Sequence, residues 1–132
     1  MWLALLLENH VHRAVAGRWL ESTESDAIGF LRVTQMSVLR LLTTSSAMNS
    51  RPLRMPEACV AYDSLFGDDR VVFVDEPSGI EAAFRKYARK NYVSPKLWAD
   101  AWLLAFAECA DGVVVTFDQA LAARASHTVL LS

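Results

Sequence analysis

The alternation of short apolar runs with longer stretches of helical periodicity is the feature that most constrains the fold. The apolar runs have the length and composition of buried strands, and they cover residues 27–31, 71–74, 113–116 and 128–131. Helical segments separate them, and a helical crossover is the usual connection between parallel strands. The sequence therefore predicts an α/β fold with a parallel sheet and helices on both faces. In such sheets ligands bind beyond the carboxyl ends of the strands.

The helical segments begin and end at recognisable residues. Pro56 and Pro95 suit first helical positions, because proline lacks the N–H group that the first turn leaves unpaired. Ser94 and Asp118 are predicted N-caps, and Gly67 is predicted to end a helix. The predicted helices cover residues 13–21, 33–43, 56–66, 78–90 and 95–110, with a brief helix after Asp118.

Size, composition and charge limit the class of protein. With 132 residues, of which 53% are hydrophobic and 21% charged, the chain has the composition of one globular domain, residues 1–132. The formal net charge of −2 excludes a protein that coats nucleic acid through bulk charge, so any nucleic-acid contact must be local. The apolar opening meets Glu8 and is much shorter than the about 20 residues of a membrane span, so we expect neither a signal peptide nor a transmembrane helix. Cys59 and Cys109 lack metal-ligand spacing and are interpreted as reduced core thiols of a cytoplasmic protein.

Asp100 lies on a predicted helix face that is otherwise apolar. The neighbours on that face are Leu97, Leu103 and Leu104. Burying an unpaired carboxylate costs several kcal/mol, so this carboxyl group must meet a cation, a metal ion or several donors, or else keep its proton. A metal-binding or catalytic role is one interpretation. The alternative is a surface aspartate that pairs with Lys96 at i−4.

Asp118 follows the strand predicted at residues 113–116, at its carboxyl end, and stands at the start of a short helix. This position suits a side chain that faces a ligand, and it suits an N-cap equally well. Together with Asp100, it provides two carboxylates on separate elements that can converge. Two carboxylates are sufficient to hold Mg²⁺ when water and phosphate fill the other coordination sites.

Two further polar features have both a functional and a structural interpretation. Gln35 interrupts an apolar helix face, either as a pocket residue beside the two acids or as a core amide satisfied by backbone groups. His10 and His12 have the spacing of a metal-binding pair, but the sequence offers no third ligand beside them, which favours structural or solvent roles.

The aromatic and basic residues are more typical of core packing and of a solvated helix face than of a nucleic-acid contact. Trp19, Trp98 and Trp102 are interpreted as core anchors rather than as a platform on which bases stack. The basic stretch at residues 85–90 is interpreted as a solvated helix face that is able to contact phosphates.

Three stretches of the sequence are informative when they are taken together. They cover residues 1–20, residues 30–43, and residues 94–101 with residues 115–118. In this combination the chain resembles PIN-domain ribonucleases of the VapC toxin type over essentially its whole length. The resemblance implies a three-layer α/β/α PIN-like domain with a central parallel sheet. It also implies a metal-dependent endoribonuclease that forms the toxin component of a toxin–antitoxin pair.

The resemblance also implies a site and partners. Asp100 and Asp118 would be the catalytic and metal-binding residues, holding Mg²⁺ or Mn²⁺ while a metal-activated water cleaves RNA. Gln35 and Thr116 would orient water or phosphate. The implied partners are the RNA substrate and a cognate antitoxin protein, with a homodimer as the common assembly and no membrane association.

The chain departs from the pattern of that family in two places. The family has an Asp-x-Asn sequence at the end of its first strand, directly before the segment that here occupies residues 2–5, and we expect that truncated strand to be encoded upstream. Most members carry a glutamate at or next to the position of Gln35, whereas one branch reads Thr-Gln as this chain does. Of the usual four acids only Asp100 and Asp118 carry over, which predicts weakened metal affinity.

Two other classes of protein compete with the nuclease. A catalytically inert PIN-like module that binds an antitoxin or RNA would keep the fold and lose the chemistry. A receiver-like α/β domain phosphorylated on aspartate is a more distant analogy, because no acidic pair stands at the end of a first strand.

Overall fold

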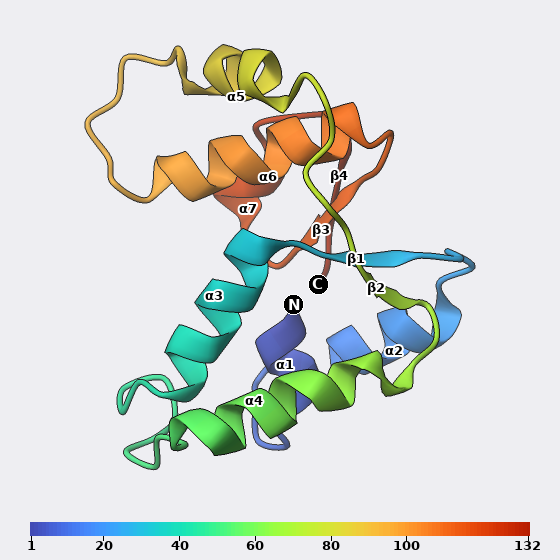
Figure 1. The fold of residues 1–132 in the computed structure, drawn as a ribbon, viewed down its shortest axis with the longest axis vertical. Helices are drawn as coiled ribbons and strands as arrows, with labels where there is room; N and C mark the ends of the chain where they lie inside the picture. The colour runs from blue at the N-terminus through green and yellow to red at the C-terminus, as the bar shows by residue number, and fades with distance from the viewer. The chain divides into compact units, whose positions relative to one another are not determined.

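The structure is a computed structural model that describes all 132 residues. The chain forms two compact units, Met1–Asp75 and Glu76–Ser132 (Figure 1). Each unit combines helices with one pair of parallel strands, which confirms the predicted α/β class. The strands form two separate two-stranded sheets, so a single central sheet in a three-layer domain stays a prediction.

The N-terminal unit contains a parallel strand pair and four α-helices. The strands are β1 (Ile28–Phe30) and β2 (Val71–Phe73). The helices are α1 (Trp2–Leu6), α2 (Arg13–Ser22), α3 (Arg32–Leu42) and α4 (Met55–Ser64), and the 3-10 turn η1 (Leu65–Gly67) follows α4. The turn ends at Gly67, where the sequence predicts the end of a helix.

The core of the N-terminal unit is built around Phe30. Because side chains alternate across a strand, Ile28 and Phe30 of β1 are both buried while Gly29 between them is exposed. The ring of Phe30 stacks on that of Trp2, with centroids 4.2 Å apart, and meets the ring of Tyr62 edge-on at 5.1 Å. These contacts join α1, β1 and α4 into one aromatic cluster.

The C-terminal unit contains the strand pair β3 (Val114–Thr116) and β4 (Thr128–Leu130), again parallel. Its helices are α5 (Ile80–Ala88), α6 (Leu97–Cys109) and the short α7 (Gln119–Ala122). Helices α5 and α6 pack against each other and are seen side by side in Figure 1. The buried side of α6 is formed by three alanines together with Leu104 and Phe106, and the small alanine side chains allow this close packing.

The predicted start of α6 is wrong by two residues. Lys96 occupies the N-cap position, and the side chain of Ser94 makes no capping bond. The carbonyl of Ser94 instead accepts a hydrogen bond from the N–H of Leu97 at 3.4 Å, which closes a separate turn before the helix begins. The Ser-Pro pair therefore marks a turn rather than a cap.

Two side chains interpreted as core residues lie at the surface. Cys59 is exposed because it follows the buried Ala58 on α4 and is rotated by about 100° away from the core face. Trp98 is 59% exposed at the beginning of α6. Both cysteines are free thiols, as expected. None of the helices has the length and apolar character required to cross a bilayer.

Candidate metal-binding site

Asp100 lies in the first turn of α6 and is mostly buried. Its Oδ2 accepts a hydrogen bond from Nη1 of Arg124 at 3.3 Å, and the two side chains are 24% and 13% exposed respectively. The expectation that this carboxyl group needs a partner is therefore confirmed, and the partner is Arg124 rather than Lys96. Arg124 also donates from Nη2 to the carbonyl of Tyr87 at 3.4 Å, so it connects α6 with the last turn of α5.

Asp118 is the N-cap of α7, as the sequence predicts. Its Oδ1 accepts hydrogen bonds from the backbone N–H groups of Ala120 at 2.8 Å and Leu121 at 3.0 Å. Its own N–H donates to Oγ1 of Thr116, the last residue of β3, at 3.0 Å. Both capping bonds use Oδ1, so they leave Oδ2 available for a ligand. The capping role and a ligand-binding role are therefore compatible in this side chain.

The two carboxylates belong to the same unit, and the charge of Asp118 acts on Asp100. Burial raises the pKa of Asp100 above its ordinary value, the charge of Arg124 lowers it, and the negative charge of Asp118 raises it. Arg124 thus only partly offsets the cost of keeping Asp100 ionised. A cation near both carboxylates would relieve the remaining cost, because it favours the ionised form of each.

The donors at this site suit a hard divalent cation. Carboxylate oxygens are the protein ligands that Mg²⁺ takes, and Mg²⁺ is commonly held by one or two carboxylates with water and phosphate. Asp100 and Asp118 supply that minimum. The chain does not bring three or more His, Cys, Asp or Glu side chains together in a metal-binding group. The residues present therefore fit a sparse site rather than an all-protein cage.

Gln35 and Thr116 have defined surroundings in their own units. Gln35 lies on α3 in the N-terminal unit, where its Oε1 accepts a hydrogen bond from Nη1 of Arg32 at 2.5 Å. Its side chain also interacts with the hydroxyl group of Tyr62. Thr116 is buried at the end of β3 and accepts the bond from the Asp118 N–H. Gln35 thus has protein partners of its own, and its role toward a substrate stays a prediction.

The two histidines near the N-terminus form a local turn. The N–H of His12 donates to Nδ1 of His10 at 3.1 Å, and the two rings lie 5.7 Å apart. Burial, followed by the charge of His12, lowers the pKa of His10. This geometry agrees with the structural role that the sequence favours for the pair.

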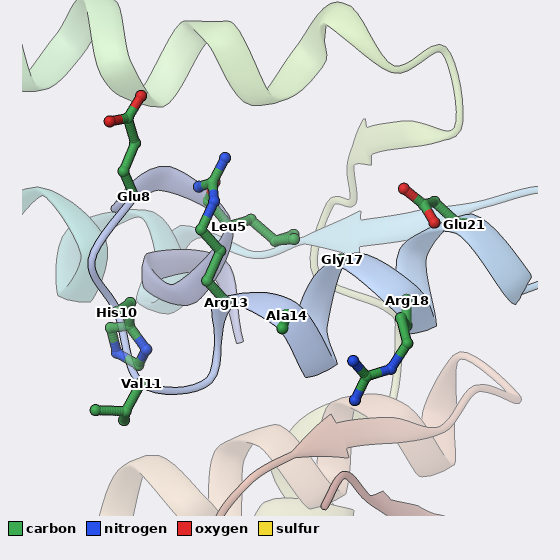
Figure 2. A pocket seen from close by; sticks show the side chains of 9 residues that line it. All are labelled: Leu5, Glu8, His10, Val11, Arg13, Ala14, Gly17, Arg18 and Glu21. Carbon is green, nitrogen blue, oxygen red and sulfur yellow. The ribbon is translucent and has the colours of Figure 1, made fainter.

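A hollow of about 610 Å³ lies beside α2 in the N-terminal unit (Figure 2). Its wall combines acids and bases, namely Glu8, Glu21, Arg13 and Arg18, with His10 and small apolar side chains. Arg13 already donates to the carbonyl of Leu5 at 2.8 Å. Neither candidate metal-binding aspartate lines this hollow, so the hollow and the acidic site are different features.

Arg124 is the residue of this site that sequence reasoning missed. A buried carboxylate demands a counter-charge, and that demand was recognisable from the apolar neighbours of Asp100. Lys96 was the local choice because it lies at i−4 on the same helix. Arg124 is 24 residues away along the chain and reaches Asp100 through tertiary structure alone.

The chain belongs to the PIN-domain family, which it matches over residues 1–126. This match confirms the resemblance inferred from the sequence. Two similar proteins, from two strains of Mycobacterium tuberculosis, are both named Ribonuclease VapC41. Each is 42% identical to this chain over 125 residues, which cover 91% of this chain and 86% of the relative. Within the family, the chain is therefore a VapC-type protein.

Proposed function

We propose that this protein is a metal-dependent endoribonuclease and the toxin component of a toxin–antitoxin pair. The observation that carries the proposal is the match to the PIN-domain family over residues 1–126, in a chain that holds Asp100 and Asp118 in the same unit. The name of the relatives, Ribonuclease VapC41, supports the same activity.

Asp100 and Asp118 would hold the cation, Mg²⁺ or Mn²⁺, and leave its other coordination sites to water and phosphate. A divalent ion bound there supplies Lewis-acid polarisation of the scissile phosphate and lowers the pKa of water. Arg124 orients the carboxyl group of Asp100 through their ion pair. The capping bonds of Asp118 fix its carboxyl group at the end of β3.

The hydroxyl oxygen of Thr116 accepts a hydrogen bond from the Asp118 N–H. A hydroxyl group that accepts in this way can still donate its own proton to another acceptor. It is therefore placed to orient water or phosphate beside Asp118.

The assembly that we propose follows from membership of the VapC-type proteins. A cognate antitoxin protein silences the nuclease, the active form is a homodimer, and the protein works in the cytoplasm. We further propose that residues 1–132 form one three-layer domain, since the match to a single family spans both units. One cooperative calorimetric transition is expected for such a domain, whereas two separate transitions would contradict it.

The experiment that tests the activity compares three proteins on an RNA substrate with Mg²⁺ or Mn²⁺. The wild type should cleave, and Asp100→Asn should lose at least about a hundredfold in rate, which corresponds to roughly 2.7 kcal/mol of transition-state stabilisation. Asp111→Asn is the matched control, because it removes an exposed carboxylate of the same unit. Chelation should abolish cleavage by the wild type.

The competing hypothesis is an inert PIN-like module that binds an antitoxin or RNA. It predicts equal behaviour of the wild type and Asp100→Asn, with no response to either metal. That result would exclude the nuclease and leave the binding module.

A further inference from the structure

Two exposed aromatic side chains lie in and just after the connection between α5 and α6. Tyr92 in the connection is 66% exposed, and Trp98 in the first turn of α6 is 59% exposed. The ring of Trp98 lies 6.0 Å from that of Phe84 on α5, which supports it from one side and leaves more than half of it in solvent. Tyrosine and tryptophan are enriched at interaction surfaces, because one end of each side chain is apolar and the other is polar.

Three cations in the same stretch of chain have no ion-pair partner. Arg89, Lys90 and Lys96 are all exposed and make no ion pair. The two cations further back on α5 differ, since Arg85 pairs with Glu81 and Lys86 pairs with Glu108. Residues 89–98 therefore carry three unbalanced positive charges and two exposed rings, in a chain whose net charge is −2.

This surface and the candidate metal-binding site both involve the first turn of α6, but on different sides of the helix. Trp98 and Asp100 are two positions apart, which is a rotation of about 200° around the helix axis. The ring of Trp98 accordingly meets Phe84 of α5, whereas the carboxyl group of Asp100 meets Arg124.

We propose that Tyr92 and Trp98, with Arg89, Lys90 and Lys96, form an aromatic–basic surface that docks single-stranded RNA. Bases stack on the two rings and phosphates meet the three cations. This inference rests on the proposed ribonuclease function for its ligand, because it names the form of the RNA substrate.

Charge complementarity favours a polyanion over a protein on this surface. Single-stranded nucleic acids are bound by the combination seen here, with aromatic rings under the bases and cations along the backbone. The cores of protein–protein interfaces are depleted in lysine, whereas Lys90 and Lys96 flank the two rings. Stacking tolerates any base, so the surface orients a strand without reading its sequence.

The test measures RNA binding separately from cleavage. Fluorescence anisotropy is recorded in EDTA with a fluorescein-labelled, unstructured single-stranded RNA of about 12 nucleotides, a length within the range that such surfaces cover. The variants are Tyr92→Ala, Trp98→Leu and Lys90→Glu. The matched controls are Tyr92→Phe, which keeps the ring, and Arg51→Glu, which reverses an exposed charge in the N-terminal unit.

We expect Tyr92→Ala and Trp98→Leu each to weaken binding about tenfold, because each removes one stacking ring. Lys90→Glu should weaken binding and reduce the slope of log affinity against log salt by about one phosphate contact. Both controls should retain the affinity of the wild type. Tyr92 is a surface residue outside any helix or strand, so its variants keep the test valid even if Trp98→Leu folds poorly.

Unchanged RNA affinity in all three variants would overturn the docking surface. If the wild type still cleaves RNA with Mg²⁺ in a parallel assay, the proposed function survives and only this inference fails. If binding depends on the surface and no cleavage is found with either metal, the nuclease fails and this inference stands. Loss of antitoxin binding at unchanged RNA affinity would assign the surface to a protein and would also overturn the proposal.

Discussion

Arg124 donates a hydrogen bond to Asp100 across 3.3 Å while it also donates to the carbonyl of Tyr87. One guanidinium group from the segment after α7 thus holds the first turn of α6 and the last turn of α5. Since Arg124 is more deeply buried than Asp100, the pair lies largely out of solvent and is less screened than a surface ion pair.

Removal of Arg124 should therefore have a larger effect than removal of a surface arginine. Arg124→Gln leaves Asp100 buried without its cation, so we expect the free energy of unfolding to fall by about 2 kcal/mol, somewhat below the cost for a fully buried pair. Urea denaturation measures this change. The control is Arg85→Gln, whose exposed pair with Glu81 should contribute no more than about 0.5 kcal/mol. Equal losses in the two variants would contradict a structural role for the buried pair.

The stability of the protein should respond to the ionisation of Asp100. Its folded-state pKa is raised, so the folded protein binds this proton more tightly than the unfolded chain does. The stability relative to Asp100→Asn should be highest below the unfolded-state pKa of 3.8 and should fall as pH rises through the folded-state pKa. Urea denaturation of both proteins in EDTA, across a series of pH values, measures the difference. A difference that grows with pH would show that Arg124 more than offsets burial.

The contribution of Asp68 to stability should have the opposite pH dependence to that of Asp100. Its hydrogen bonds with Arg70 lower its pKa from 3.8 to about 2, and Arg70 also donates to the carbonyl groups of Leu20 and Thr23 at the end of α2. A depressed pKa means that the contribution is present above pH 3.8 and is lost as pH falls through about 2. The stability of the wild type relative to Asp68→Asn should accordingly shrink over that range, as followed by circular dichroism. A stability difference between the two proteins that does not change with pH would show that the Asp68–Arg70 pair is not its source.

Phe30 should be the most costly core residue to truncate in the N-terminal unit. Its fully buried ring contacts both Trp2 and Tyr62, so Phe30→Ala removes contacts with α1 and α4 at once. We expect a loss of about 3–5 kcal/mol in the free energy of unfolding, measured in urea. Val60→Ala, at an exposed position of α4, should change stability by less than about 0.5 kcal/mol.

Features that depend on local sequence were predicted correctly. The apolar runs that became β2 and β3, the helical periodicity of α2 and α3, and the cap at Asp118 all arise from residues close together in the chain. The alternation of these elements was sufficient to give the α/β class. It did not give the observed division into two strand pairs, because which strands form hydrogen bonds is decided by long-range contacts.

The site was predictable only in part for the same reason. The apolar neighbours of Asp100 showed that it needs a partner, but its identity as Arg124 depends on how α6 packs in the C-terminal unit. The exposure of Trp98 was not predictable, because Trp98 belongs to the same apolar helix as the buried residues Ala101 and Leu104. A helix that is apolar nearly all round does not reveal which side faces solvent.

Two substitutions at Asp118 separate its structural role from its chemical one. Asparagine is as good an N-cap as aspartate, so Asp118→Asn should keep the bonds to Ala120 and Leu121 and leave the free energy of unfolding within about 0.5 kcal/mol of the wild type. Asp118→Ala removes the cap and should cost about 1 kcal/mol. If the carboxylate binds a divalent ion, both variants should lose Mg²⁺-dependent cleavage, and neither should show the increase in melting temperature that Mg²⁺ gives the wild type. Full cleavage by Asp118→Asn, together with an unchanged response to Mg²⁺, would mean that Asp118 only caps α7 and that metal binding and cleavage do not depend on its carboxylate.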